Sequence, residues 1–129
     1  MRLPTANVGS LLIYIYVLKS CSMKRADFDN LISSEGLVLI DFYAAWCGAC
    51  GAIDDALDRV VLSMGDVVTL VRIDTTTPTS FELVRRYNVV ALPTLMLFSR
   101  GRVLWRECGL ITFERLSGIV RRFHSANVY

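Results

Sequence analysis

The sequence predicts an α/β domain whose mixed β-sheet carries helices on both faces. Apolar runs at residues 38–42, 67–73 and 94–98 are typical of buried strands. A helical pattern separates the first two runs, which indicates a strand–helix–strand unit. The third run and residues 103–107 flank the dipeptide Arg100-Gly101, a pattern that favours a hairpin. A parallel unit followed by a hairpin makes the sheet mixed.

Helical patterns account for most of the remaining chain. Residues 50–64 place apolar side chains three, four and seven positions apart, which is the stripe of a helix packed on a core. Shorter helices are predicted at 27–34, where Gly36 would end the helix, and at 80–87. An amphipathic pattern over 113–123 predicts a closing helix.

The composition fits one domain of ordinary charge. A chain of 129 residues that is 53% hydrophobic can bury a core without disulfide staples. Its net charge of +2 creates no strong field toward nucleic acid. Four cysteines in this length do not make a secreted disulfide scaffold.

Cys47 and Cys50 are the main candidates for chemistry. They follow a predicted strand and open a predicted helix, where free N–H groups and the helix dipole stabilise a thiolate. A nucleophilic thiol with a partner one turn away can perform thiol–disulfide exchange. A structural pair without chemistry is one alternative, and a zinc site is another. Zinc needs four ligands, and nothing in the spacing of Cys21, Cys108 and His124 favours such a site.

Asp41 is a second candidate, because it interrupts the apolar strand that leads to the cysteines. Burial there would raise its pKa and suit it to accept or donate a proton. The alternative is a carboxylate that faces solvent at a strand edge.

Four segments resemble the thioredoxin family. Residues 41–50, DFYAAWCGAC, are similar to its active-site segment, and residues 90–98, VALPTLMLF, to its cis-proline loop and the next strand. Ile73-Asp74 and the pair Gly101 and Gly109 also match in order and spacing. The resemblance implies the thioredoxin fold, with a central mixed sheet of four to five strands.

The resemblance also implies roles for individual residues. Cys47 would attack a substrate disulfide, Cys50 would resolve the mixed disulfide, and Asp41 would transfer protons. Pro93 would be cis, leaving the backbone of Leu92 to pair with an extended substrate. Further docking contacts would come from Trp46, Gly48, Ala49, Ala91 and Gly109. Trp46 has ordinary packing as its alternative.

The expected activity is that of a protein-disulfide reductase acting in cell redox homeostasis. The cysteine pair carries both electrons, so no metal or organic cofactor is expected. The expected partners are protein disulfides and a thioredoxin-reductase-type electron donor, without nucleic acid or stable membrane association, and the chain would be a monomer. The alternatives are an exported disulfide oxidase or isomerase and a non-catalytic thioredoxin-fold scaffold.

Several positions depart from the family pattern. Ala49 replaces the usual proline between the cysteines, which should make the couple less reducing, and Gly51 replaces a basic residue. A buried lysine that commonly partners the aspartate falls on Leu70, with Arg72 two residues later. Asn88 stands where glycine is frequent.

The N-terminal segment allows three interpretations. Residues 1–16 would be a tail or targeting segment and 17–129 the thioredoxin domain, with a first strand near 14–21. Alternatively, residues 1–22 are a signal peptide, or Met23 is the true start. The first interpretation places the protein in the cytoplasm, and the second exports it.

Overall fold

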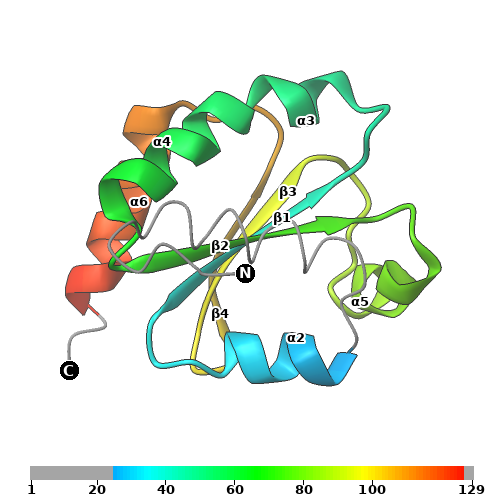
Figure 1. Cartoon of the computed structure of the whole chain (residues 1–129), viewed down its shortest axis with the longest axis horizontal. Coiled ribbons are helices and arrows are strands. Elements are labelled where there is room, and N and C mark those ends of the chain that lie inside the picture. Colours follow the sequence, from blue (N-terminus) through cyan, green and yellow to red (C-terminus); the bar gives the residue numbers. More distant parts are fainter. Residues whose placement is uncertain (1–24, 127–129) are drawn as a thin grey trace, which may run out of the picture.

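Four strands form one sheet in the computed structural model, which describes residues 25–126 (Figure 1). They are β1 (Leu37–Tyr43), β2 (Val68–Asp74), β3 (Thr94–Ser99) and β4 (Arg102–Cys108). Their order is β2-β1-β3-β4, with β1 parallel to β2 and antiparallel to β3, and β3 antiparallel to β4. The predicted mixed sheet is therefore confirmed. The strand expected near residues 14–21 lies outside the described residues.

Helices cover both faces of the sheet, as predicted. One layer contains α4 (Asp54–Met64) and α6 (Phe113–Ala126), and the other contains α2 (Arg25–Ile32) and α5 (Phe81–Arg86) (Figure 1). Short elements complete the chain: α3 (Gly48–Ala52) follows β1, and a 3-10 turn, η1 (Pro78–Ser80), precedes α5.

Strand β1 divides its side chains between the two cores because alternate residues point to opposite faces. Leu37 and Leu39 enter the core under α4 and α6, whereas Ile40 and Phe42 enter the core over α2 and α5. Asp41 continues the first set, so its carboxyl lies on the face that α4 covers.

The prediction of one helix over residues 50–64 was wrong in one respect. The helix is broken at Ile53, which ends α3 and precedes α4 with φ −94° and ψ −2°. Ile53 is buried in the core under α4, while Gly51 and Ala52 are exposed. The apolar stripe continues through the break, which is why the sequence pattern does not reveal it.

The hairpin between β3 and β4 turns through Arg100 and Gly101, which have φ values of 53° and 78°. Two positive φ values in a two-residue loop favour Asn-Gly. We expect Arg100→Asn to raise the free energy of unfolding by about 0.5 kcal/mol, because asparagine adopts this conformation at lower cost than arginine. Urea denaturation measures the change, and Arg102→Asn, at the first residue of β4, is the control that should bring no gain.

Candidate active site

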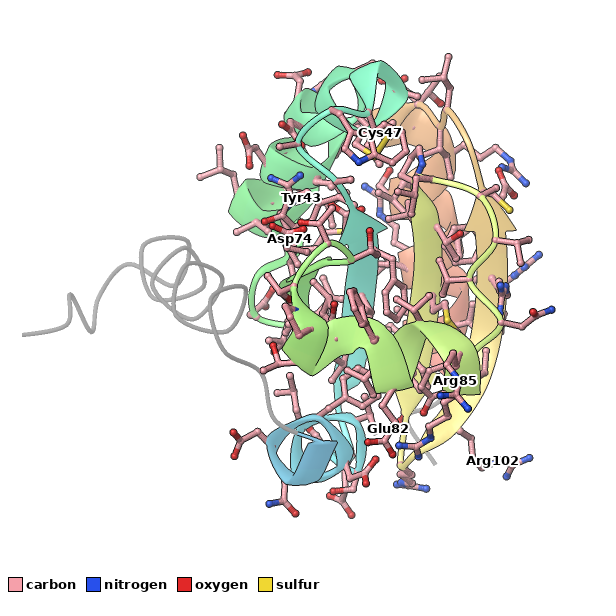
Figure 2. All side chains as sticks on the ribbon, turned by 90° about the vertical axis from the view of Figure 1, so that its right-hand side faces the viewer. Tyr43, Cys47, Asp74, Glu82, Arg85 and Arg102 are labelled. Atoms are coloured by element: carbon pink, nitrogen blue, oxygen red, sulfur yellow. A yellow bond between two sulfur atoms is a disulfide. The ribbon has the colours of Figure 1, made fainter. Side chains whose placement is uncertain are left out.

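Cys47 and Cys50 form a disulfide where β1 leads into α3, with their Cα atoms 5.3 Å apart (Figure 2). A turn after β1, in which the Cys47 N–H donates to the Ala44 carbonyl at 3.1 Å, sets Cys47 at the N-cap of α3. The Cys47 sulfur accepts a hydrogen bond from the Cys50 N–H at 3.2 Å. Such a donor would stabilise a Cys47 thiolate after reduction.

The two sulfurs differ in access. Cys47 is 9% exposed and Cys50 is 1% exposed, so an incoming group reaches Cys47 more easily. Ala44, Ala49 and Leu92 pack around the pair and keep its surroundings apolar. Within residues 25–126, no three or more His, Cys, Asp or Glu side chains gather as a metal site would require.

The loop before β3 is tied to the loop after β4 beside the disulfide. The Leu92–Pro93 bond is cis, the isomer that the family resemblance implies. The Gly109 N–H donates to the Pro93 carbonyl at 2.9 Å, and Gly109 has a φ of 91° that favours glycine. The Thr94 hydroxyl donates to the Ala91 carbonyl at 2.6 Å. These bonds engage the carbonyls of Ala91 and Pro93, on either side of Leu92.

Asp41 is fully buried and is bound by Arg72. The strand register places Asp41 opposite Arg72, and the Arg72 Nε donates to Asp41 Oδ2 at 2.8 Å. Asp41 Oδ1 accepts no hydrogen bond from the described residues. The charge partner that the family places two residues earlier is therefore supplied here by Arg72.

Arg72 contacts two further groups. Its Nη2 lies 3.2 Å from Asp54 Oδ1 at the start of α4, and its guanidinium carbon lies 4.0 Å from the centre of the Tyr43 ring. The Asp54 contact is an ion pair without hydrogen-bond alignment, since Asp54 Oδ1 accepts no hydrogen bond from the described residues. Burial lowers the pKa of Arg72, and Asp74 opposes that change.

The electrostatics favour a protonated Asp41. Burial, and then repulsion from Asp54, raise the pKa of Asp41 from 3.8 to about 8. Burial also raises the pKa of Asp54, with a smaller contribution from Asp58. A carboxyl group with a pKa near neutrality can both accept and donate a proton under cellular conditions.

An exposed surface surrounds the disulfide. Trp46 is 76% exposed and Val90 is 83% exposed. Gly48 and Ala91 are also exposed, while Ala49 and Gly109 are half-buried. We call the exposed residues Trp46, Gly48, Val90 and Ala91 the docking face.

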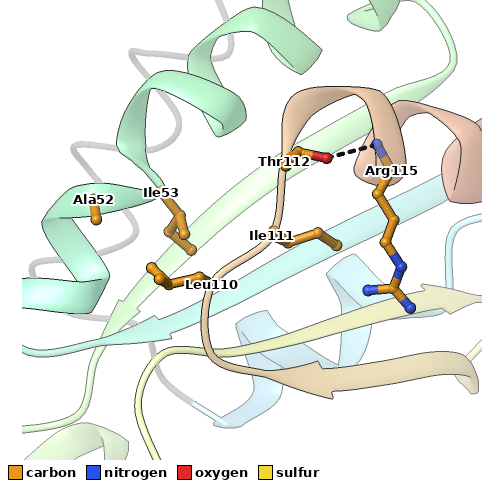
Figure 3. Close-up of a pocket in the computed structure, with 6 residues that line it drawn as sticks. All are labelled: Ala52, Ile53, Leu110, Ile111, Thr112 and Arg115. Atoms are coloured by element: carbon orange, nitrogen blue, oxygen red, sulfur yellow. Dashed lines mark hydrogen bonds between the residues drawn. The ribbon is translucent and has the colours of Figure 1, made fainter.

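An apolar groove of about 410 Å³ opens at the break between α3 and α4. Figure 3 shows Ile53 and Leu110 pointing toward each other across it. At its far side, Thr112 Oγ1 accepts a hydrogen bond from the Arg115 N–H at 3.1 Å (Figure 3). Sequence reasoning missed this groove because its walls come from segments 57 residues apart, a distance no local pattern spans.

Sequence reasoning also missed Asp54. The contact of Asp54 with Arg72 depends on where α4 begins and on the reach of the arginine side chain, and neither is encoded in a local pattern. Arg72 could be singled out from the sequence, because it lies two residues after the position of the family's charge partner. Only the strand register decides that it reaches Asp41.

The family model and two of the curated relatives that match this chain are thioredoxins. The thioredoxin family model matches residues 19–121. Thioredoxin from Bacillus subtilis is 36% identical over 90 residues, which cover 70% of this chain and 85% of that protein. Thioredoxin Y from the chloroplast of Oryza sativa is 39% identical over 92 residues, or 70% of this chain. The chain spans about half the length of such chloroplastic relatives, 54% for the rice protein.

Solved structures agree with the fold. Oxidised mitochondrial thioredoxin 3 from Saccharomyces cerevisiae superposes with a TM-score of 0.66 at 27% identity, covering 75% of this chain and 88% of that one. A Halobacterium salinarum thioredoxin mutant gives a TM-score of 0.69 at 25% identity, covering 80% and 88%. None of the helices between residues 25 and 126 has the length and hydropathy needed to cross a membrane.

Proposed function

This chain belongs to the thioredoxin family, and on that premise we propose that it is a protein-disulfide reductase that acts through Cys47 and Cys50. The observation that carries the proposal is the disulfide at the start of α3, where the outer sulfur is the more exposed. The two cysteines exchange two electrons with a substrate disulfide, so the couple needs no organic cofactor or metal.

The proposed reaction has two steps. The Cys47 thiolate attacks one sulfur of the substrate disulfide, which forms a mixed disulfide and releases the first substrate thiolate. Cys50 then loses its proton to Asp41 and attacks the Cys47 sulfur, which releases the second substrate thiolate. The buried Cys50 needs a local base, and Asp41, whose pKa of about 8 lets it exchange a proton near neutral pH, is the candidate.

We propose that substrates bind as extended chains across the docking face. The segment from Ala91 to Pro93 would present the Leu92 backbone to the substrate. The hydrogen bond from the Gly109 N–H to the Pro93 carbonyl supports this segment. An electron donor of the thioredoxin-reductase type would return the disulfide to the dithiol. A curated relative in Mycobacterium leprae, 33% identical over 82 residues, is named a bifunctional thioredoxin reductase/thioredoxin, which supports this class of donor.

The reduction potential of the Cys47–Cys50 couple tests the proposal. Equilibration in glutathione or dithiothreitol buffers, followed by thiol trapping, measures it. A value near about −270 mV supports a reductase, and we propose the cytoplasm as its compartment. A value above roughly −200 mV would favour the oxidase or isomerase of an exported compartment instead. Failure to form the disulfide would leave the scaffold interpretation.

Ala49→Pro should make this couple more reducing. Proline removes one N–H from the first turn of α3, and with it a donor that can stabilise the Cys47 thiolate. The loss of about 1.4 kcal/mol of stabilisation corresponds to about 30 mV in a two-electron couple. The same equilibration measures the shift, and Ala52→Ser, at the last residue of α3, is the control. An unchanged potential would contradict the role of this N–H.

A further inference from the structure

Asp54 and Arg72 are placed to control Asp41 from outside the reacting groups. Arg72 is the link, because its Nε binds Asp41 Oδ2 at 2.8 Å while its Nη2 lies 3.2 Å from Asp54 Oδ1. The Asp54 side chain is 43% exposed and that of Asp41 is buried, so the guanidinium joins an interior carboxyl to one at the surface.

We propose that Asp41, Arg72 and Asp54 form a charge-sharing triad. In this triad Asp54 is a positioning residue that sets the pH range over which Asp41 can take the proton of Cys50. The inference rests on the proposed function and names a regulatory element of that same site. Arg72 divides its positive charge between the two acids. Its attraction to Asp54 therefore weakens its attraction to Asp41, and the reverse also holds.

The geometry gives each member a separate task. The guanidinium carbon of Arg72 lies 4.0 Å from the centre of the Tyr43 ring, a cation–π contact that stabilises the guanidinium where it meets the two acids. Its bond to Oδ2 leaves Asp41 Oδ1 without a hydrogen bond from the described residues, and this oxygen is the one available to hold the proton. Asp54 begins α4 directly after the break at Ile53, so the break itself brings this carboxylate to Arg72.

Other charged or titratable groups near Asp41 are few among residues 25–126. Strand β2 also carries Asp74, which acts on Arg72, helix α4 carries Asp58, which acts on Asp54, and α3 carries Cys50. Strand β4 carries Glu107 opposite Leu95, and Glu107 is paired with Arg115. In the core on this face, β3 and α6 contribute apolar residues such as Leu95 and Leu116. Arg72 and Asp54 are therefore the groups whose removal should change Asp41 most.

The test follows proton transfer from Cys50 in single-turnover reduction of the aromatic disulfide DTNB. Cys47 attacks DTNB and releases one thionitrobenzoate, and Cys50 then attacks Cys47 and releases the second. Two electrons pass from the dithiol to DTNB, and the Cys50 proton passes to Asp41. All proteins carry Cys21→Ser and Cys108→Ser, because Cys108 is exposed and free and additional thiols would react with the probe.

Asp54→Asn should move the midpoint of the pH profile for release of the second thionitrobenzoate to lower pH by about half a unit or more. The repulsion between Asp54 and Asp41 is lost, and Arg72 then pairs with Asp41 alone among the two acids. Arg72→Met should move it to higher pH. Asp55→Asn removes the same charge one residue away, where the side chain is exposed, and should leave the profile unchanged. The ¹³C carboxyl titration of Asp41 in each protein should show the same three directions without any need for turnover.

The inference is overturned if Asp54→Asn matches Asp55→Asn in both readouts. It is also overturned if Arg72→Met leaves the Asp41 titration in place. Where Arg72→Met does not fold, Arg72→Lys replaces it, because a lysine cannot bridge both acids with a fixed fork, and its midpoint should lie above that of the unsubstituted triad. A protein that never releases the second thionitrobenzoate would refute the proposed function, while the carboxyl titration would still decide the triad.

Discussion

Replacing Cys50 with serine should stop the reaction after its first step. Cys47 keeps its place at the N-cap of α3 and attacks a disulfide, but no thiol remains to resolve the mixed disulfide. In a Cys21→Ser and Cys108→Ser background, one thionitrobenzoate should be released instead of two, and mass spectrometry should show the other attached to Cys47. Turnover with a protein disulfide such as insulin should fall by roughly 100-fold or more.

The matched control is Cys47→Ser in the same background. Cys50 is 1% exposed, so this variant should release little thionitrobenzoate in the same time and accumulate no adduct. Rapid release by Cys47→Ser and none by Cys50→Ser would reverse the two roles. Equal release by both would show that access does not distinguish the two sulfurs.

Asp41→Asn should stabilise the folded protein at alkaline pH. Burial raises the pKa of Asp41 from 3.8 to about 8, so the folded state binds the proton more tightly than the unfolded state. The stability that this proton contributes is full below pH 4 and is lost as the pH rises toward 8. Asparagine does not ionise, so above pH 8 the free energy of unfolding of Asp41→Asn should exceed that of the unsubstituted protein by about 2–4 kcal/mol. The ion pair between Arg72 and an ionised Asp41 limits this gain.

Urea denaturation of the oxidised protein between pH 4 and pH 9 measures this difference. The curves of the two proteins should diverge with rising pH, and Asp55→Asn, which removes an exposed carboxylate, should not diverge in this way. Parallel curves would show that Asp41 has an ordinary pKa in the folded protein. The second thionitrobenzoate release should also slow by about tenfold or more in Asp41→Asn, because Cys50 loses its base.

The sheet and its helical layers could be predicted because their signals are local. Apolar runs marked the strands, and the stripe from Ile53 to Met64 marked the helix that covers the active-site face. The break at Ile53 could not be predicted, since the side chain stays in the core and the pattern is uninterrupted. The helix expected at residues 27–34 lies at Arg25–Ile32, so Gly36 falls in the segment that follows the helix instead of ending it.

Some residues of the candidate site could be predicted from local motifs, whereas the contacts among others could not. The cysteines, Asp41 and Pro93 lie within recognisable segments, and their motif could be read directly. The contact of Arg72 with Asp41 depends on the β1–β2 register, and that with Asp54 depends on a helix boundary. Both are set by tertiary packing, which no short stretch of sequence records.

The loops that border the disulfide are anchored before any partner arrives. Arg106 on β4 donates to the carbonyl of Tyr87 and, at 2.7 Å, to that of Asn88, which holds its positive φ of 51°. Together with the bond from Gly109 to Pro93, these contacts leave the loops little conformational entropy to lose on association. Calorimetry should therefore find a smaller entropic penalty for trapping a substrate peptide on Cys50→Ser than on the same protein with Arg106→Ala.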